Sequence, residues 1–475
     1  MLSIDVYGTH VKYVLLWTDF LLYLLTVAVV VTFVFARGKE HLRSPWRQVA
    51  CSKQAMASLV VLSFYIVFAL MDSVHFREPL ANQKQDSPVQ YAVEVTSVLD
   101  RVLDELANKV EKTYSAPFAT HAYIKENVER NGRQVRDYKR LLYGGSHLKN
   151  PDQRLADIVI TAMAGLSVGL AICLVLYLAC ITLLSNHYRH TLLDTMANTW
   201  HDRYPVPWRE VFITAGILLI LFVMVVVLST KYHVLGTDKV GNDVLYKALK
   251  SIRTGVLIGT LTTLVMLPFA VLLGAAAGYF RGVVDDIIQY IYTTLNSIPS
   301  ILLIVAAVFS ISVYLETHQE LFDNATRADM RLLFLCIILG ITSWTGLCRL
   351  LRGESLKLRE IDYVAAATAF GVGHFTVIWR HVVPNVMHIV LISVVLDFSG
   401  LVMAEALLSY IGVGVDPTMD SWGNMINGAR LEMAREPMVW WSLLAAFIFM
   451  FILVLAANLF SDIVRDAFDP RLRKQ

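Results

Sequence analysis

Three acidic residues, Asp19, Asp397 and Glu405, lie inside long apolar stretches of this 475-residue sequence. A carboxylate in such a stretch disfavours membrane insertion by ~2.5 kcal/mol or more, so it usually faces a cavity or a partner. Asp397 and Glu405 are eight residues apart, which places them on roughly the same side of one predicted helix. They are candidates for lining a path or for carrying protons or cations. A structural hydrogen bond to a neighbouring helix is the alternative for each acid.

Other motifs argue against catalysis by this chain. The sequence has no Gly-x-x-x-x-Gly-Lys-Ser/Thr loop, which cradles the phosphates of ATP, so we expect no ATP hydrolysis here. Ser167, between Gly165 and Gly169, fits the Gly-x-Ser-x-Gly hydrolase pattern, but that pattern needs a strand-to-helix turn and this one lies within an apolar stretch. Small residues here favour close helix packing instead. His187 and His190 lack a third ligand, so we predict no metal site.

The composition indicates a polytopic, all-helical membrane protein. Hydrophobic residues make up 56% and charged residues 17%, and mean hydropathy is +0.55. Continuous apolar stretches exclude soluble enzymes and disordered proteins and disfavour a β-barrel, and a net charge of +2 gives no indication of nucleic-acid binding. The predicted spans are 13–36, 55–71, 158–184, 211–229, 255–279, 287–313, 332–348, 386–410 and 438–460.

Basic residues in short loops predict the orientation. The 37–54 loop is basic and the N-terminus holds only Lys12, so we expect the N-terminus outside and the C-terminus in the cytoplasm of a bacterial inner membrane. The basic residues of the loop are Arg37, Lys39, Arg43, Arg47 and Lys53, and those of the tail are Arg465, Arg471, Arg473 and Lys474. The 230–254 loop disagrees, since it should lie outside and yet contains five basic residues.

The longest polar segment, 72–156, falls outside in this scheme. Its apolar residues recur at three- and four-residue steps, which predicts a mostly helical insert with one apolar stripe. The stripe consists of Val95, Leu99, Val102, Leu106 and Val110. This insert would either cap the protein's own outer face or dock an external partner.

A cytoplasmic segment at 353–385 is built for docking. Leu356–Phe370 reads as a short amphipathic helix, and Gly371 can stop it in a left-handed cap. A second short helix is expected to start near His374 and to end before Pro384. A helix–Gly–helix between two spans could act as a rigid lever against a separate protein.

At these residues the sequence resembles a known family. Ala365, Ala366 and Ala367, followed by Gly371 and by Pro384 at the matching distance, resemble the EAA loop of ABC importer permeases. Further blocks resemble the C-type permease of dipeptide and oligopeptide importers, in family order from about residue 205 to the C-terminus. They are Gly236-Thr237-Asp238, Gly241-Asn242-Asp243, Ala277-Gly278-Tyr279-Phe280, Arg380-His381, Pro384-Asn385, Ala404 to Gly412, Ser421-Trp422-Gly423, Arg465-Asp466-Ala467 and Asp469-Pro470-Arg471.

The resemblance implies a type I ABC importer fold, with a six-helix core at 205–475. Two extra helices at 1–71, the insert at 72–156 and a third extra helix with its linker at 157–204 precede it. Partners would be a second permease, two ATPases that bind ATP and Mg, and an external binding protein; this chain would bind no cofactor. The family's motif glutamate falls on Ala365, so Glu360 or Asp362 could supply the acid contact.

The sequence thus predicts a transport subunit that moves peptides or a related solute inward and couples to ATPases through 353–385. Di- or oligopeptides, antimicrobial peptides, nickel chelates and sugars all stay open as substrates. The alternative is a self-contained, ion-gradient-driven transporter in which Asp19, Asp397 and Glu405 carry the ions. A membrane hydrolase using Ser167 is a remote third reading.

Overall fold

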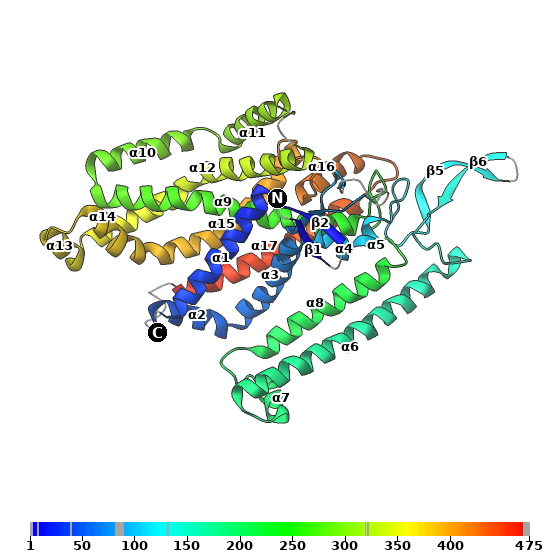
Figure 1. The fold of residues 1–475 in the computed structure, drawn as a ribbon, viewed down its shortest axis with the longest axis horizontal. Helices are drawn as coiled ribbons and strands as arrows, with labels where there is room; N and C mark the ends of the chain where they lie inside the picture. The colour runs from blue at the N-terminus through cyan, green and yellow to red at the C-terminus, as the bar shows by residue number, and fades with distance from the viewer. Residues whose placement is uncertain are drawn as a thin grey trace. The chain divides into compact units, whose positions relative to one another are not determined.

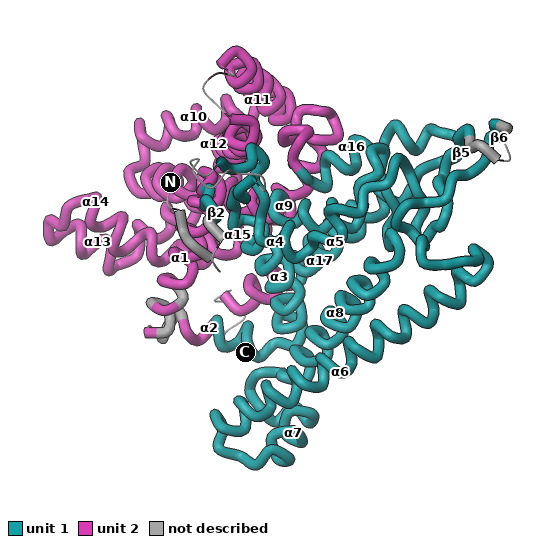
Figure 2. The backbone as a smooth tube through the Cα atoms, turned by 45° about the vertical axis from the view of Figure 1, so that its right-hand side comes forward, with its two compact units in different colours: residues 1–14, 46–254, 420–459 teal, residues 15–45, 255–419, 460–475 magenta. Residues whose placement is uncertain are grey.

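The computed structural model describes residues 3–6, 9–38, 40–80, 90–130, 133–318, 320 and 323–468. The predicted Asp469-Pro470-Arg471 block and the basic residues Lys39, Arg473 and Lys474 lie outside them. The chain forms two compact units, each built from separated segments (Figure 2). Unit 1 comprises 1–14, 46–254 and 420–459, and unit 2 comprises 15–45, 255–419 and 460–475.

Long apolar helices dominate both units (Figure 1). Among the described residues, eight helices are long and apolar enough to span a membrane, and α1 contains a shorter apolar stretch, Trp17–Thr32. The prediction of an all-helical polytopic membrane protein is therefore confirmed. The bounds are α1 Trp17–Arg37, α3 Lys53–Asp72, α6 Arg154–Tyr188, α8 Trp208–Ser229, α9 Val244–Phe280, α11 Ser300–Thr317, α12 Asn324–Arg359, α15 Val383–Ile411 and α17 Trp441–Phe468.

The predicted span 287–313 is wrong as a single helix. The chain there forms α10 (Gly282–Ser297) and then α11, which begins at Ser300. Pro299 lies between them, and Ile298 before it is extended, with ψ 129°. A proline disfavours helical geometry at its predecessor by steric clash, and here the apolar run is cut in two.

The prediction of a mostly helical insert at 72–156 is also wrong. Its helices are α4 (Val98–Val102), α5 (Asp104–Ala107) and one 3₁₀ turn, Pro151–Gln153. Of the predicted stripe, Leu99 and Leu106 are buried, whereas the side chain of Val102 is 61% exposed. The missed signal is the Asn-Gly pair at 131–132, a dipeptide typical of two-residue hairpin turns.

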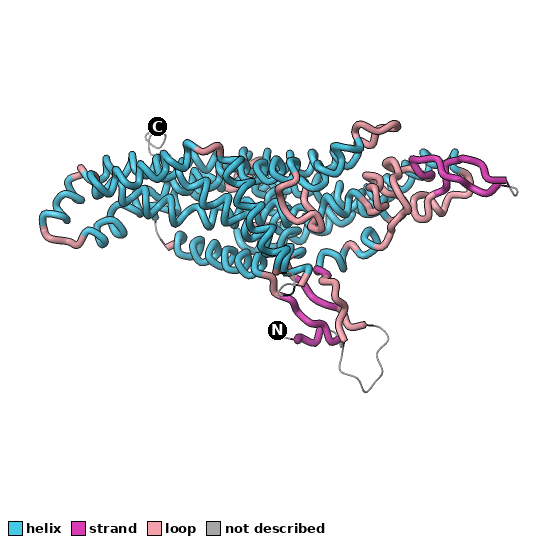
Figure 3. The backbone as a smooth tube through the Cα atoms, turned by 90° about the horizontal axis from the view of Figure 1, so that it is seen from above, coloured by secondary structure: helices cyan, strands magenta, loops and turns pink. Residues whose placement is uncertain are grey.

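Two small β-sheets include much of the segment that was predicted to be helical (Figure 3). The hairpin β5 (His121–Arg130) and β6 (Arg133–Arg140) is antiparallel and pairs Arg130 with Arg133. The second sheet has the order β1-β2-β3-β4. It joins N-terminal strands to the insert, and its strands are β1 Ser3–Val6, β2 Thr9–Val14, β3 His75–Arg77 and β4 Thr96–Ser97.

In unit 1, α6 and α8 lie side by side as a helical pair (Figures 1 and 2). Gly165 and Gly169 face α8 so closely that a Cβ on them would lie 3.0 Å from Met224 Cα and 3.2 Å from Ile220 Cα. The sequence motif around Ser167 is therefore a packing face, and Ser167 itself is exposed and donates to the Ala164 carbonyl. Glycine permits this backbone approach.

The core of unit 2 gathers α9, α10, α12 and α15 around fully buried side chains such as Cys348, Leu351 and Val386. Gly274 and Gly278 bring α9 against α12, since a Cβ on Gly278 would lie 2.6 Å from the Arg352 carbonyl oxygen. Arg352 also donates to both carboxylate oxygens of Asp285 on α10, at 2.5 and 2.7 Å. A bidentate pair of this kind fixes the orientation of both side chains.

We predict that Gly165→Leu destabilises the protein by about 1–3 kcal/mol, because the added side chain forces α6 and α8 apart. Ser167→Leu, on the exposed face of the same helix, is the matched control and should leave stability nearly unchanged. Thermal unfolding in detergent measures both variants. Equal midpoints for the two variants would contradict the packing role of the glycine face.

Candidate functional site

The predicted docking segment folds as a compact helical hairpin in unit 2. The α13–α14 hairpin consists of α13 (Asp362–Ala369) and α14 (His374–Val377), joined by a turn. Gly371 in this turn has φ +77°, a left-handed conformation that favours glycine. The predicted stop at Gly371 and restart at His374 are confirmed. The predicted start at Leu356 is wrong, because α12 continues to Arg359 and the chain breaks at Glu360–Ile361.

The predicted helix end before Pro384 is wrong as well. After α14 the chain makes a π-helical turn, Ile378–Val382, and passes directly into α15. Pro384 has no N–H and would clash with the carbonyl four residues earlier in a regular helix. The wider π turn, in which the Val383 N–H reaches the Ile378 carbonyl, precedes this proline and lets the helix continue.

Buried valines anchor the hairpin on the core of unit 2. Val364, Val377 and Val382 have no exposed surface. Polar contacts add to this anchor: the Asn385 amide donates to the Tyr363 hydroxyl at 3.0 Å, and the Tyr279 hydroxyl lies 3.0 Å from His374 Nδ1. The hairpin is therefore held as a rigid body on α9 and α15.

The opposite face of the hairpin is apolar and exposed. Phe370 is 88% exposed and Phe375 75% exposed, one on each side of the turn. Ala365 and Ala366 are exposed beside them, and Ala367 is partly covered. Large aromatic side chains left in solvent on a rigid element mark a contact surface.

The carboxylates of Glu360 and Asp362, near the hairpin, differ in whether they already have an ion-pair partner. Glu360 pairs with Arg281, and the hydrogen bond and charge of this guanidinium lower the pKa of the Glu360 carboxyl. Asp362, in the first turn of α13, is exposed and forms no ion pair or side-chain hydrogen bond within the described part of the chain. Only Asp362 thus presents a carboxylate without a partner here.

The intramembrane acids separate into different environments. Asp19 is completely buried, and Glu405 is 2% exposed and accepts a hydrogen bond from the Ser409 hydroxyl at 2.7 Å. Asp397 is half-buried and has no hydrogen bond or ion pair to any residue that the structure describes. Their role in a translocation path stays a prediction.

The sequence reasoning missed a buried ionic network in unit 1. His233 Nδ1 lies 2.7 Å from Asp243 Oδ2, and its Nε2 lies 3.6 Å from Glu111 Oε1. Glu111 also accepts from the backbone N–H groups of Leu142, Tyr143 and Gly144. This network joins the insert to the 230–243 segment. Of its three charged members, only Asp243 belongs to a block that resembles the family. A histidine and a glutamate 122 residues apart offer no spacing signal.

The network has a defined charge state. Burial alone would lower the pKa of His233, but the hydrogen bond with Asp243 and the charges of Asp243 and Glu111 raise it to about 9. Burial would likewise raise the pKa of Glu111, but the nearby His233 and the hydrogen bonds from the three backbone N–H groups lower it to about 2. At neutral pH an imidazolium thus lies between two carboxylates.

We predict a loss of stability as pH rises from about 6 to above 9. The pKa of His233 is raised from 6.5 to about 9 on folding, so its contribution is complete below 6.5 and disappears as pH passes 9. His233→Gln should flatten this part of the pH profile of thermal unfolding, whereas His201→Gln, at an exposed site, should not. An unchanged slope in His233→Gln would refute the assignment.

Comparisons with known proteins agree with this architecture. Residues 270–474 match the family described as binding-protein-dependent transport system inner membrane component. The oligopeptide transport system permease protein OppC of Mycobacterium tuberculosis is 32% identical over 241 residues, which cover 51% of this chain and 77% of that protein. The glutathione transport system permease protein GsiD of Pectobacterium atrosepticum is 30% identical over 243 residues, which cover 51% of this chain and 73% of that protein. The dipeptide transport system permease protein DppC of Bacillus subtilis is 28% identical over 242 residues, which cover 51% of this chain and 70% of that protein.

The family match, the similar permeases and the apolar helices all agree on the nature of the C-terminal half of the chain. The fold there is the type I ABC importer transmembrane fold, and the chain is a multi-pass protein of the inner membrane rather than an enzyme. The chain belongs to the family of binding-protein-dependent inner membrane transport components, as a permease subunit.

Proposed function

We propose that this chain is one of two different permease subunits in an ATP-driven importer of peptides. The relatives are permeases of oligopeptide, dipeptide and glutathione transport systems, which supports peptides as the solute class. Two cytoplasmic ATPases bind ATP and Mg, and an external binding protein delivers the solute. The N-terminus lies outside and the C-terminus in the cytoplasm.

The observation that carries the proposal is the α13–α14 hairpin. Two short helices, anchored by completely buried valines, present Phe370 and Phe375 to solvent. A rigid lever with an exposed aromatic tip suits a groove in a separate ATPase. Because the π turn joins α14 to α15 without a break in the helix, a push on the hairpin is passed directly to an apolar helix of the core.

We propose that Asp362 replaces the missing motif glutamate. The motif position is Ala365, whose methyl group cannot accept a hydrogen bond. Glu360 is held by Arg281, whereas Asp362 lies on α13 itself with no ion-pair partner among the described residues. One helical turn separates Asp362 from Ala365, so both side chains lie on the same side of α13.

Asp397 and Glu405 remain the proposed path residues, with different roles. The half-buried carboxylate of Asp397 lies in an apolar helix, where a cationic group of the solute would compensate its charge. The buried Glu405, bonded to Ser409, is better suited to holding α15 in shape. The path would form between this chain and the second permease.

Removal of the aromatic tip should uncouple transport from ATP. In proteoliposomes with the assembled complex, Phe370→Ala with Phe375→Ala should lower ATP-driven peptide uptake about tenfold, since a buried aromatic anchor contributes about 1–2 kcal/mol or more to an interface. Phe447→Ala, an exposed aromatic on α17, is the matched control. Uptake driven by an ion gradient without ATP or partner subunits would overturn the proposed function in favour of a secondary transporter.

The proposed acid contact has a separate test. Asp362→Asn should lower ATP-driven uptake by about tenfold, because a hydrogen bond to a charged group is lost. Glu360→Gln should have a smaller effect, since that carboxylate already bonds Arg281 on the same chain. Assembly, measured by co-purification of the ATPases, should weaken in the first variant only. The reverse order would assign the contact to Glu360.

A further inference from the structure

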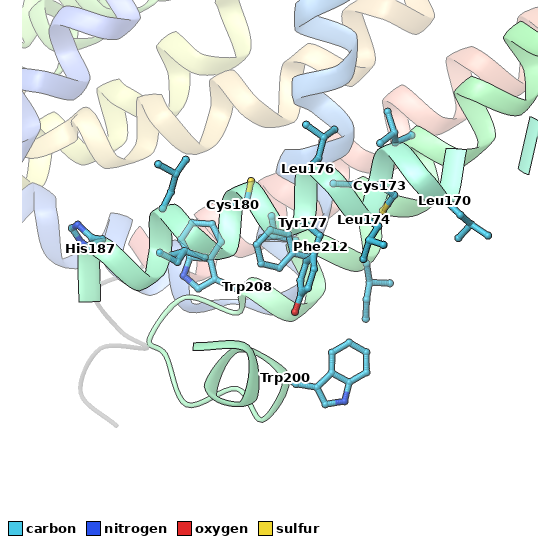
Figure 4. A pocket seen from close by; sticks show the side chains of 17 residues that line it. Leu170, Cys173, Leu174, Leu176, Tyr177, Cys180, His187, Trp200, Trp208 and Phe212 are labelled. Atoms are coloured by element: carbon cyan, nitrogen blue, oxygen red, sulfur yellow. The ribbon is translucent and has the colours of Figure 1, made fainter. Parts of the chain in front are cut away.

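An apolar groove of about 910 Å³ lies on the α6–α8 pair in unit 1 (Figure 4). Its walls come from the C-terminal half of α6, the N-terminal half of α8 and one residue of α7 (Leu192–Trp200). Tyr177 of α6 packs edge-on against Phe212 of α8, with ring centroids 5.1 Å apart. Trp200 of α7 and Trp208 of α8 line its loop end.

The groove covers only part of the helical pair. On α6 it extends from Leu170 to His187, whereas the helix itself begins at Arg154. Beyond the groove, Gly165 and Gly169 bring the two helices into close contact. At 1.5 Å per residue the groove is about 25 Å long, which fits one leaflet with its headgroup region and falls short of the 40–45 Å of a whole bilayer. A partner helix that spans the membrane would need a longer contact face.

Basic residues lie at the loop end of the groove. His187 lines the groove, and Arg189 and His190, both exposed, follow it at the end of α6. Arg189 caps α6 in a left-handed conformation, with φ +54°, and forms no ion pair within the described residues. Asp202 and Glu210 are already paired, because each contacts both Lys53 and Arg209. Asp194, four residues after His190, accepts a hydrogen bond from the Thr191 hydroxyl.

We propose that this groove binds one anionic phospholipid of the cytoplasmic leaflet. The acyl chains occupy the apolar walls between α6 and α8, and the phosphate lies beside Arg189 and His190. Trp200 and Trp208 lie at the headgroup level, where amphipathic rings are enriched in membrane proteins. The extra helix α6 would thereby gain a lipid ligand selected by charge.

Native mass spectrometry of the full-length protein with added phosphatidylglycerol or phosphatidylcholine tests the proposal. We expect one tightly bound lipid, with phosphatidylglycerol preferred. Ala215→Trp, which fills the groove, should abolish this binding, whereas Ile217→Trp, exposed on the same helix outside the groove, should retain it. The double variant Arg189→Gln, His190→Gln should lose the preference for phosphatidylglycerol by about fivefold or more, and Arg154→Gln, at the other end of α6, should keep it.

Two outcomes would overturn the proposal. One is unchanged lipid binding in Ala215→Trp together with normal thermal unfolding, since the variant is then folded and the groove is not the site. The other is efficient cross-linking of Cys180, a natural thiol in the groove, to another subunit of the assembled complex by a short bismaleimide. The second result would show that a protein helix, and not a lipid, occupies the groove.

Discussion

Most of this structure follows from one constraint, the absence of water as a hydrogen-bond partner for the backbone inside a membrane. Each apolar segment must satisfy its own N–H and C=O groups, and a helix is the local solution. Two of the prolines in apolar runs show different responses. At Pro299 the helix ends and a new one begins, whereas before Pro384 a π turn absorbs the misfit and the helix continues.

Under the proposed function, the helix geometry at Pro384 would decide whether the α13–α14 hairpin can move α15. A break there would leave the α13–α14 hairpin attached through a hinge, and displacement of the hairpin would be lost in the joint. The continuous helix instead makes the hairpin the end of α15. Buried valines prevent the hairpin from rolling on the core, and the exposed Phe370 and Phe375 remain free for a partner. The buried valines that anchor the hairpin and the exposed phenylalanines thus lie on opposite faces of the same short helices.

The sequence was sufficient for features that depend on local composition. Apolar length located the spans except the one at 287–313. Gly371 predicted the turn of the hairpin, because glycine adopts the left-handed conformation that this turn needs. The sequence reasoning failed where two rules compete over a few residues, as at Pro384. It also failed in the insert, where the hairpin signal at 131–132 was overlooked and the apolar stripe forms only the short helices α4 and α5. The Glu111–His233–Asp243 network could not be predicted, because its members meet only after folding.

Unit 1 contains segments from both ends of the chain, and this has a consequence for biogenesis. The α6–α8 pair is made of neighbouring sequence and can associate soon after its synthesis. By contrast, Trp422 and Trp441 reach back to the backbone carbonyls of Ala248 and Thr237, over 174 and 204 residues. The insert contacts this same region, since Ser115 bonds Thr237. The region near residue 237 therefore completes its contacts only after the chain has been synthesised beyond residue 441.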